Sequence, residues 1–292
     1  MRRPALAVVL VLLSACAPRG EQGAQGGAPP DSAARTALPT PSALTAVAAR
    51  LDPALRGREA VVARLRMDSG TPTADSVFLR ARGSFALAID SIGTAMYDDS
   101  AFQGWVGSDS AAAEADTWFR ARGLRLSWSE GSAYPSEDTG EWLRLAGPYV
   151  TAPMREYLAL RNHDEAQRFT NDAALQIPWD SLAERIAGWD RFIEGHPGFV
   201  LLREAEMWRG IFLRTYLTGI DNSRVFEDSL VPEVRKSYER FVERHGATRT
   251  GALVRGYLDV LGASGGRETD EVVAFRRANG IRSMIGMQPP IR

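Results

Sequence analysis

The feature that most restricts the fold of this chain is a nine-residue segment that occurs twice, 49 positions apart. Residues 189–197 read WDRFIEGHP and residues 238–246 read YERFVERHG, with identical arginine, phenylalanine, glutamate and histidine. Downstream, MWRGIF at 207–212 is similar to LVRGYL at 253–258, at an offset of 46. Each copy therefore predicts one helix, a turn near the histidine and a second helix, with the second connection three residues shorter.

Helix hairpins repeated at this length are typical of α-solenoids, in which each hairpin packs against its neighbours. The aromatic-x-x-Phe-x-x-x-His-Pro ending resembles the tetratricopeptide-like helical repeats found in bacterial envelope lipoproteins. The resemblance covers about 80 residues, and its period is longer than the roughly 34 residues of that repeat. It implies a concave surface that binds partners. The alternative is that any two amphipathic helix hairpins share such features.

The remaining patterns are also mainly helical. Six apolar residues follow Pro72 at near-helical spacing: Val77, Phe78, Phe85, Ile89, Ile92 and Met96. Ser108 is placed to cap a helix that ends at Gly123. From Glu137 onward we expect helices at about 137–146, 150–161, 164–174, 180–195, 199–218, 229–245, 249–262 and 268–279, separated by prolines and glycines.

Residues 124–128, LRLSW, alternate with a period of two and are the best strand candidate. A lone strand cannot satisfy its own backbone hydrogen bonds, so we expect a small hairpin or a strand packed on a helix. The fold class predicted is mainly α, with α-solenoid-like helix hairpins and at most a small β-hairpin near 124–128. We divide the folded body into a mostly helical region at 42–147 and the helical-repeat region at 148–292.

The first sixteen residues have the organisation of an export signal. Arg2 and Arg3 precede an apolar run from Ala5 to Leu13, and small residues follow it. Nine apolar residues are too few for a transmembrane helix, which needs about 20. Cys16 is the only cysteine, and an unpaired thiol in an oxidising compartment would be a liability. An ordinary secretory signal with a chance cysteine is the alternative.

The run Leu13-Ser14-Ala15-Cys16 resembles the lipobox of bacterial lipoproteins. The resemblance implies that residues 1–15 are a signal peptide, that the Cys16 thiol carries a diacylglycerol and that the new amino terminus is acylated, as with palmitate. Ala17, where an aspartate would retain a lipoprotein in the inner membrane, favours the periplasmic face of the outer membrane. Residues 16–41 are rich in Gly, Pro, Ala and Gln without apolar periodicity, and we interpret them as a disordered tether.

The charge balance gives no case for nucleic acid as a partner. Loss of Arg2 and Arg3 with the signal would leave 33 basic residues against 36 acidic ones, a net charge of −3. Binding of nucleic acid calls for a basic face or stripe. We therefore expect the membrane, through the lipid anchor, and envelope proteins as partners. Whether the protein takes a small-molecule ligand is left open.

The three histidines give little support for metal or catalytic chemistry. His196 and His245 occupy the same repeat position just after a helix, where a polar group at the helix C-terminus is favourable. His163 could bind a metal with Glu165 or Asp172. However, the chain has no HExxH motif, and zinc sites commonly need at least three protein ligands. We predict no metal and no cofactor.

The region between Trp128 and Trp142 is the best candidate for a ligand. Glu130, Glu137, Asp138 and Glu141 lie near Trp128, Tyr134 and Trp142, and carboxylates beside aromatic rings are what a glycosidase needs. The alternative is a solvated loop beside buried aromatic residues. The candidate ligand region comprises Trp128, Glu130, Tyr134, Glu141, Trp142 and His163.

Two common catalytic motifs are missing from the sequence. Residues 262–266, GASGG, lack the Lys-Ser/Thr of a phosphate-binding loop, and no Gly-x-Ser-x-Gly elbow occurs. We therefore expect a non-enzymatic, lipid-anchored scaffold or adaptor for cell-envelope partners. The alternative is a peptidoglycan- or carbohydrate-directed enzyme or binding protein that uses the Trp128–Trp142 region.

Overall fold

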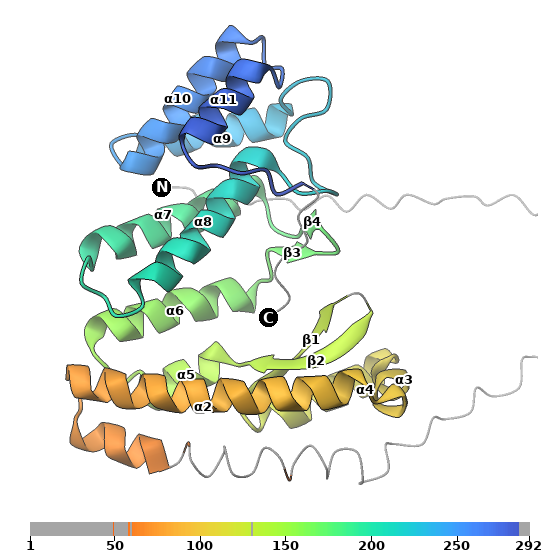
Figure 1. The fold of residues 1–292 in the computed structure, drawn as a ribbon, viewed down its shortest axis with the longest axis vertical. Coiled ribbons are helices and arrows are strands. Elements are labelled where there is room, and N and C mark those ends of the chain that lie inside the picture. The colour runs from red at the N-terminus through yellow and green to blue at the C-terminus, as the bar shows by residue number, and fades with distance from the viewer. Residues whose placement is uncertain (1–48, 50–57, 59, 130, 286–292) are drawn as a thin grey trace, which may run out of the picture. The chain divides into compact units, whose positions relative to one another are not determined.

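The computed structural model describes residue 49, residue 58 and residues 60–129 and 131–285 (Figure 1). The predictions made for Cys16, the signal peptide, the tether and Glu130 lie outside the described residues. The described part is mainly helical, as predicted. After a helical stretch at 60–67, its elements are α2 Pro72–Tyr97, α3 Ser100–Val106, α4 Asp109–Arg120, β1 Leu124–Ser129, β2 Ser132–Glu137, α5 Thr139–Ala146, α6 Ala152–Ala166, β3 Thr170–Asn171, β4 Ala174–Leu175, α7 Trp179–Gly195, α8 Leu202–Thr218, α9 Pro232–His245, α10 Arg249–Ala263 and α11 Asp270–Ala278.

The long helix α2 begins where the sequence predicts. The Thr71 side chain accepts a hydrogen bond from the Ala74 N–H, and Pro72 occupies the first turn, where its missing N–H costs nothing. The predicted apolar face is buried at Phe78, Phe85, Ile89, Ile92 and Met96. This face packs against β2 and α3 and forms the core of the N-terminal region.

The expected β-hairpin is present as β1 and β2, which pair antiparallel from Leu124 opposite Glu137 to Ser129 opposite Ser132. Side chains satisfy part of the backbone at its two edges. The Gln103 amide binds both the N–H and the carbonyl of Ala133, and Asp116 accepts a hydrogen bond from the Leu126 N–H. Because open strand edges recruit further strands, these contacts help to keep the hairpin two-stranded.

The prediction of a helix at 164–174 is wrong. Helix α6 ends at Ala166, and the chain then forms the short antiparallel hairpin of β3 and β4. Asp172 and Ala173, in the turn of this hairpin, have φ values of 48° and 51°, which a helix does not allow and a two-residue hairpin turn requires. Arg185 donates to the carbonyls of Asp164 and Gln167, so a tertiary contact ends α6.

The two predicted repeat hairpins are α7 with α8 and α9 with α10, and each pair packs together. Their connections are residues 196–201 and 246–248, so the second is three residues shorter, as expected. Phe192 and Phe241 are buried at equivalent positions, with 0% and 2% of their surface exposed. The helix-hairpin organisation predicted from the repeat is confirmed.

The first helices of the two hairpins lie side by side and run parallel. Arg240 on α9 pairs with Asp180 on α7 at 2.7 Å, and one helical turn later Arg244 pairs with Glu184 at 3.1 Å. Both pairs join residues that are 60 positions apart, which requires that the two helices point in the same direction. Successive hairpins therefore stack as in a solenoid.

Candidate functional site

The candidate residue Trp142 belongs to the core of the N-terminal region. Its indole is 1% exposed and packs edge-on against Phe78 and Phe85, with ring centroids 5.4 and 5.6 Å away. Such packing is typical of buried aromatic clusters. Trp142 therefore positions α5 against α2.

The other predicted ligand residues point in several directions. Glu141 pairs with Arg144 at 2.7 Å on α5, and His163 is exposed on α6. Trp128 and Tyr134 are partly buried and lie on opposite faces of the hairpin, because Tyr134 is opposite Ser127, the neighbour of Trp128. Within the described residues, no three His, Cys, Asp or Glu side chains are grouped so that they could hold a metal ion.

The two repeat histidines make matching contacts between helices. His196 lies against Phe192 with ring centroids 4.9 Å apart, and His245 lies against Phe241 at 5.0 Å. Each imidazole also reaches a glutamate of the preceding helices. His196 is 2.9 Å from Glu156, and His245 is 3.7 Å from Glu184. These histidines join neighbouring layers of the stack.

The structure assembles a cluster that the sequence did not predict. We call Arg82, Glu137, Tyr157, Arg161, Glu165 and Glu204 the junction cluster; they come from α2, β2, α6 and α8. Arg82 binds Glu137 through Nε and Nη2, at 2.9 and 3.0 Å, and lies 3.6 Å from Glu204. Tyr157 donates to Glu204 Oε1 at 2.5 Å. One arginine therefore holds carboxylates from β2 and α8 together.

The second half of the junction cluster is built around Arg161. Its guanidinium lies over the Trp208 ring, 3.8 Å from the centroid, and its Nη2 donates to Glu165 at 2.8 Å. Glu165 also accepts a hydrogen bond from the Thr139 N–H at the start of α5. Burial raises the pKa of Glu165, the charge on Arg161 lowers it, and the charge on Glu137 adds a smaller increase.

A buried ion pair supports the junction cluster from behind. Asp164 accepts a hydrogen bond from the Trp189 indole N–H at 2.8 Å and lies 3.4 Å from Arg185 Nε. Burial raises the pKa of Asp164, although the indole hydrogen bond and the charge on Arg185 oppose this rise. Because Arg185 also binds the last carbonyls of α6, the position of Arg161 and Glu165 is fixed by α7.

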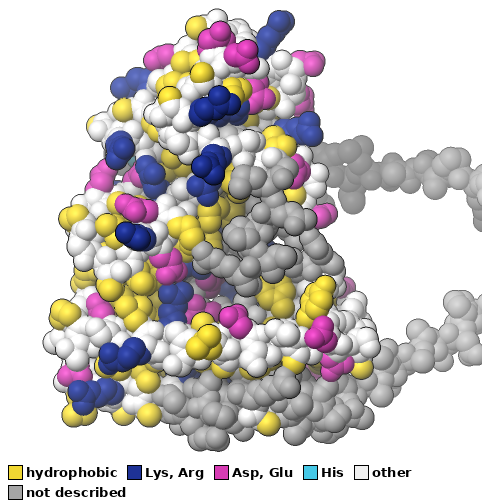
Figure 2. Space-filling model, in the orientation of Figure 1, with side chains coloured by type: hydrophobic (Ala, Val, Ile, Leu, Met, Phe, Trp, Pro, Cys, Tyr) yellow, Lys and Arg dark blue, Asp and Glu magenta, His cyan; other side chains and the backbone are white. Residues whose placement is uncertain are grey.

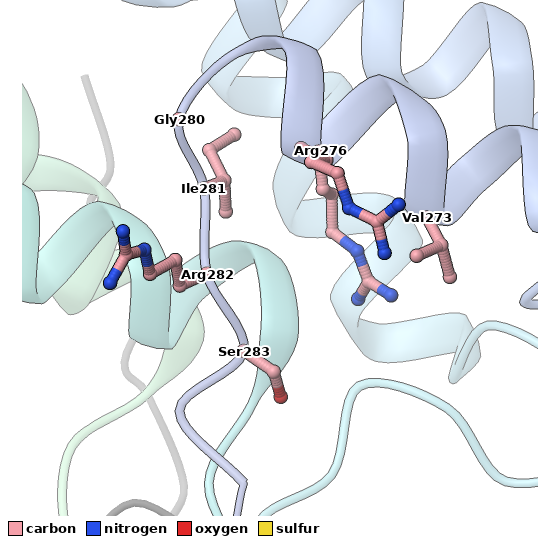
Figure 3. Close-up of a pocket in the computed structure, with 7 residues that line it drawn as sticks. Val273, Arg276, Gly280, Ile281, Arg282 and Ser283 are labelled. Atoms are coloured by element: carbon pink, nitrogen blue, oxygen red, sulfur yellow. The ribbon is translucent and has the colours of Figure 1, made fainter.

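A separate cavity of about 500 Å³ lies between α11 and the chain that follows it (Figure 3). It is lined by Val273, Arg276, Gly280, Ile281 and neighbouring residues. Arg276 pairs with Glu268, and Arg282 extends away from Arg276 toward α8. Because Arg276 and Arg282 do not converge on a common point, the junction cluster is the better candidate site.

The chain matches no family model, no curated protein and no solved structure. Within the described residues, no helix has both the length and the apolar character needed to cross a bilayer.

The sequence did contain a partial signal for the junction cluster. Arg161 and Glu165 are four positions apart on α6, where such a pair shares one helix face, but nothing local connects them with Arg82 or Glu204.

Proposed function

We propose that this protein is a lipid-anchored component of the bacterial cell envelope whose helical body acts as a non-enzymatic scaffold or adaptor. The observation that carries the proposal is the parallel stacking of α7 and α9. It places the first helices of two successive hairpins side by side in one layer, with the Asp180–Arg240 and Glu184–Arg244 pairs along their exposed edge. Stacked helix hairpins present extended surfaces that suit protein partners.

The interior of this layer is rigid. Trp189, Phe192, Tyr238 and Phe241 are each at most 2% exposed, and Tyr216 lies between the hairpins with its ring 4.8 Å from that of Tyr238. A close-packed aromatic interior holds the outer side chains in constant relative positions. Preorganisation of this kind lowers the entropy lost when a partner binds.

The anchor in this proposal rests on the lipobox-like run that ends at Cys16. Two or three acyl chains would hold the protein on a membrane, whereas a single chain binds only marginally. Cys16→Ser should abolish labelling by a palmitate analogue and leave unprocessed precursor or soluble protein. Labelling that persists in this variant would contradict the anchor.

The adaptor role is tested by placing a photo-crosslinking residue at exposed positions of the two first helices, Arg191 on α7 and Lys236 on α9. In living cells we expect discrete adducts with an envelope protein, and Cys16→Ser should reduce them. The control positions for the crosslinker are Arg255 and Asp259, which are exposed on the second helix α10. Equal adducts at all four positions, or none at any, would contradict an adaptor surface on α7 and α9.

A further inference from the structure

The chain that follows α11 carries positive charge that no acidic residue neutralises. Of the seven residues that line the cavity beside α11, three are arginines and none is acidic. Arg276 is buried and pairs with Glu268. Arg277 and Arg282 are exposed and form no ion pair within the described part of the chain. Figure 2 shows basic side chains over α11 and just below it on the face that is drawn.

A third arginine lies beside Arg282. The Met284 N–H donates to Thr218 Oγ1 at 3.1 Å, which fixes this chain against the last turn of α8, and Arg214 lies one turn before Thr218. Burial lowers the pKa of Arg214, the charge on Arg282 lowers it further, and no carboxylate opposes either effect. A like charge acts in this way only at short range, so the two guanidinium groups are neighbours. We call Arg214, Arg277 and Arg282 the arginine patch.

The backbone that carries the arginine patch is fixed at both ends. Gly280 has a φ of 70°, and the Ile281 N–H donates to the Arg276 carbonyl at 2.8 Å, as is usual where a helix ends at a glycine. Ile281 is 6% exposed and belongs to the hydrophobic core, and Met284 is bound to α8. Little backbone entropy is therefore lost when a partner binds here.

The arginine patch fits a charged surface better than a single small anion. Figure 3 shows Arg282 extending away from Arg276 toward α8, so the cations around the cavity do not meet at one point. Separate guanidinium groups can each meet a different headgroup of an anionic bilayer, where the attraction of each basic residue adds to that of the others. Ile285, which follows the patch, is 40% exposed and supplies an apolar side chain for the headgroup boundary.

The charges elsewhere in the chain favour one orientation on such a surface. The acidic residues of α11 are Asp270 and Glu271 in its first turn. Glu271 is six residues before Arg277, or about 9 Å along the helix axis, which exceeds the Debye length of about 8 Å at physiological ionic strength. Without the signal the whole chain has a net charge of −3. An anionic bilayer therefore attracts the arginine patch and repels most of the remaining surface.

We propose that the arginine patch docks against the anionic phospholipid headgroups of the membrane that holds the protein, and thereby orients the helical body on that membrane. The inference rests on the lipid anchor of the proposed function. It does not rest on the α7–α9 surface proposed for protein partners.

The first experiment places a photo-crosslinking residue at Ser283, which is exposed between Arg282 and Met284. The full-length, lipidated protein is reconstituted in vesicles of phosphatidylcholine and in vesicles of equal parts phosphatidylcholine and phosphatidylglycerol. Lipid adducts at Ser283 should be about fivefold more abundant in the anionic vesicles and should decrease as salt is added. The control position is Ser91, which is exposed on α2 and should give few adducts in either vesicle.

The second experiment removes the charge and keeps the size of the side chains. Arg277→Gln combined with Arg282→Gln should reduce the adducts at Ser283 in anionic vesicles to the level seen in neutral ones. The matched control combines Arg267→Gln with Arg249→Gln, which removes the same charge from two exposed arginines outside the patch. This control should leave the adducts unchanged. Circular dichroism identifies any variant that has lost its fold, and only folded variants are compared.

Flotation of the vesicles separates failure of the anchor from failure of the patch. Protein that floats with both vesicles but gives equal adducts at Ser283 in both, or as few as at Ser91, would show that the patch does not dock. Failure to float with either vesicle would contradict the anchor and the patch together. Inorganic phosphate should compete no better than chloride at equal ionic strength. Stronger competition by phosphate would show a site for single anions and overturn the docking of a surface.

Discussion

The two repeat hairpins share a sequence pattern but are anchored by different interactions. Around α7 and α8 the buried contacts are charged: Trp189 donates to Asp164, and Arg209 pairs with Asp190 at 2.8 Å. Around α9 and α10 the contacts that reach back to α8 are hydrogen bonds from tyrosine hydroxyl groups to backbone carbonyls, and the buried charge beside them, Arg276, pairs with Glu268 on the far side. Tyr238 donates to the Tyr216 carbonyl at 2.6 Å, and Tyr257 donates to the Leu217 carbonyl at 3.1 Å.

The difference follows from what each hairpin packs against. The first hairpin meets α6, whose polar C-terminal end Arg185 holds in place, whereas the second packs against α7 and reaches the end of α8 through Tyr238 and Tyr257. Buried charges have a large desolvation cost and respond to protonation, whereas buried hydroxyl groups at neutral pH do not. One repeat pattern therefore supports one hairpin held by a buried carboxylate and another held at α8 by buried tyrosine hydroxyl groups.

The largest expected effect should be common to both hairpins. Phe192→Ala and Phe241→Ala each remove a buried ring and should lower the free energy of unfolding by about 3–5 kcal/mol. Urea unfolding of the two variants measures this directly. A loss below about 1 kcal/mol in only one of them would show that the two rings are not equivalent.

The next effect should appear in the first hairpin alone. Asp164→Ala removes the acceptor of the Trp189 indole and leaves Arg185 without its buried carboxylate. We expect a loss of about 3 kcal/mol, because a stranded buried charge is strongly destabilising. The measurement is again urea unfolding. If unfolding is unchanged, the carbonyl contacts of Arg185 alone are enough to hold α6.

A smaller effect is expected in the second hairpin. Tyr238→Phe deletes one hydroxyl, keeps the buried ring and loses the hydrogen bond to the Tyr216 carbonyl. The free energy of unfolding should fall by about 1 kcal/mol, and this loss should be constant from pH 5 to 8. A loss that varies strongly with pH would contradict the neutral character of this interface.

The smallest effect is a pH dependence that belongs to the first hairpin. Burial raises the pKa of Asp164 above the usual value of about 3.9, so the folded state binds more protons than the unfolded state just above that pH. The stabilising contribution of the protonated Asp164 carboxyl is complete below the pKa that Asp164 has in the unfolded chain. It is lost as the pH rises through the pKa that Asp164 has in the folded protein. Asp164→Asn should reduce this decline. Equal slopes in the two proteins between pH 4 and 6.5 would count against it.

Helix starts and the repeat were predictable because their signals are local. Thr71, Asp138 and Thr248 each accept a hydrogen bond from an N–H three residues later, a geometry contained within one turn. The sequence alignment of the second helices, α8 and α10, agrees less well with the structure. Phe212 is one of two buried aromatic residues of α8 and lies 45 positions before Tyr257, the buried aromatic residue of α10, whereas the sequence alignment has an offset of 46.

The sequence by itself determined that the described chain is mainly helical, that a strand follows α4, and that two helix hairpins repeat near the C-terminus. These features depend on apolar spacing and capping within about twenty residues. Only the tertiary structure decided where α6 ends, that Trp142 belongs to the core, and that Arg82, Arg161 and Glu204 meet. The reason is that an ion cluster from four elements has no local signal: its members pair only after the helices that carry them have packed.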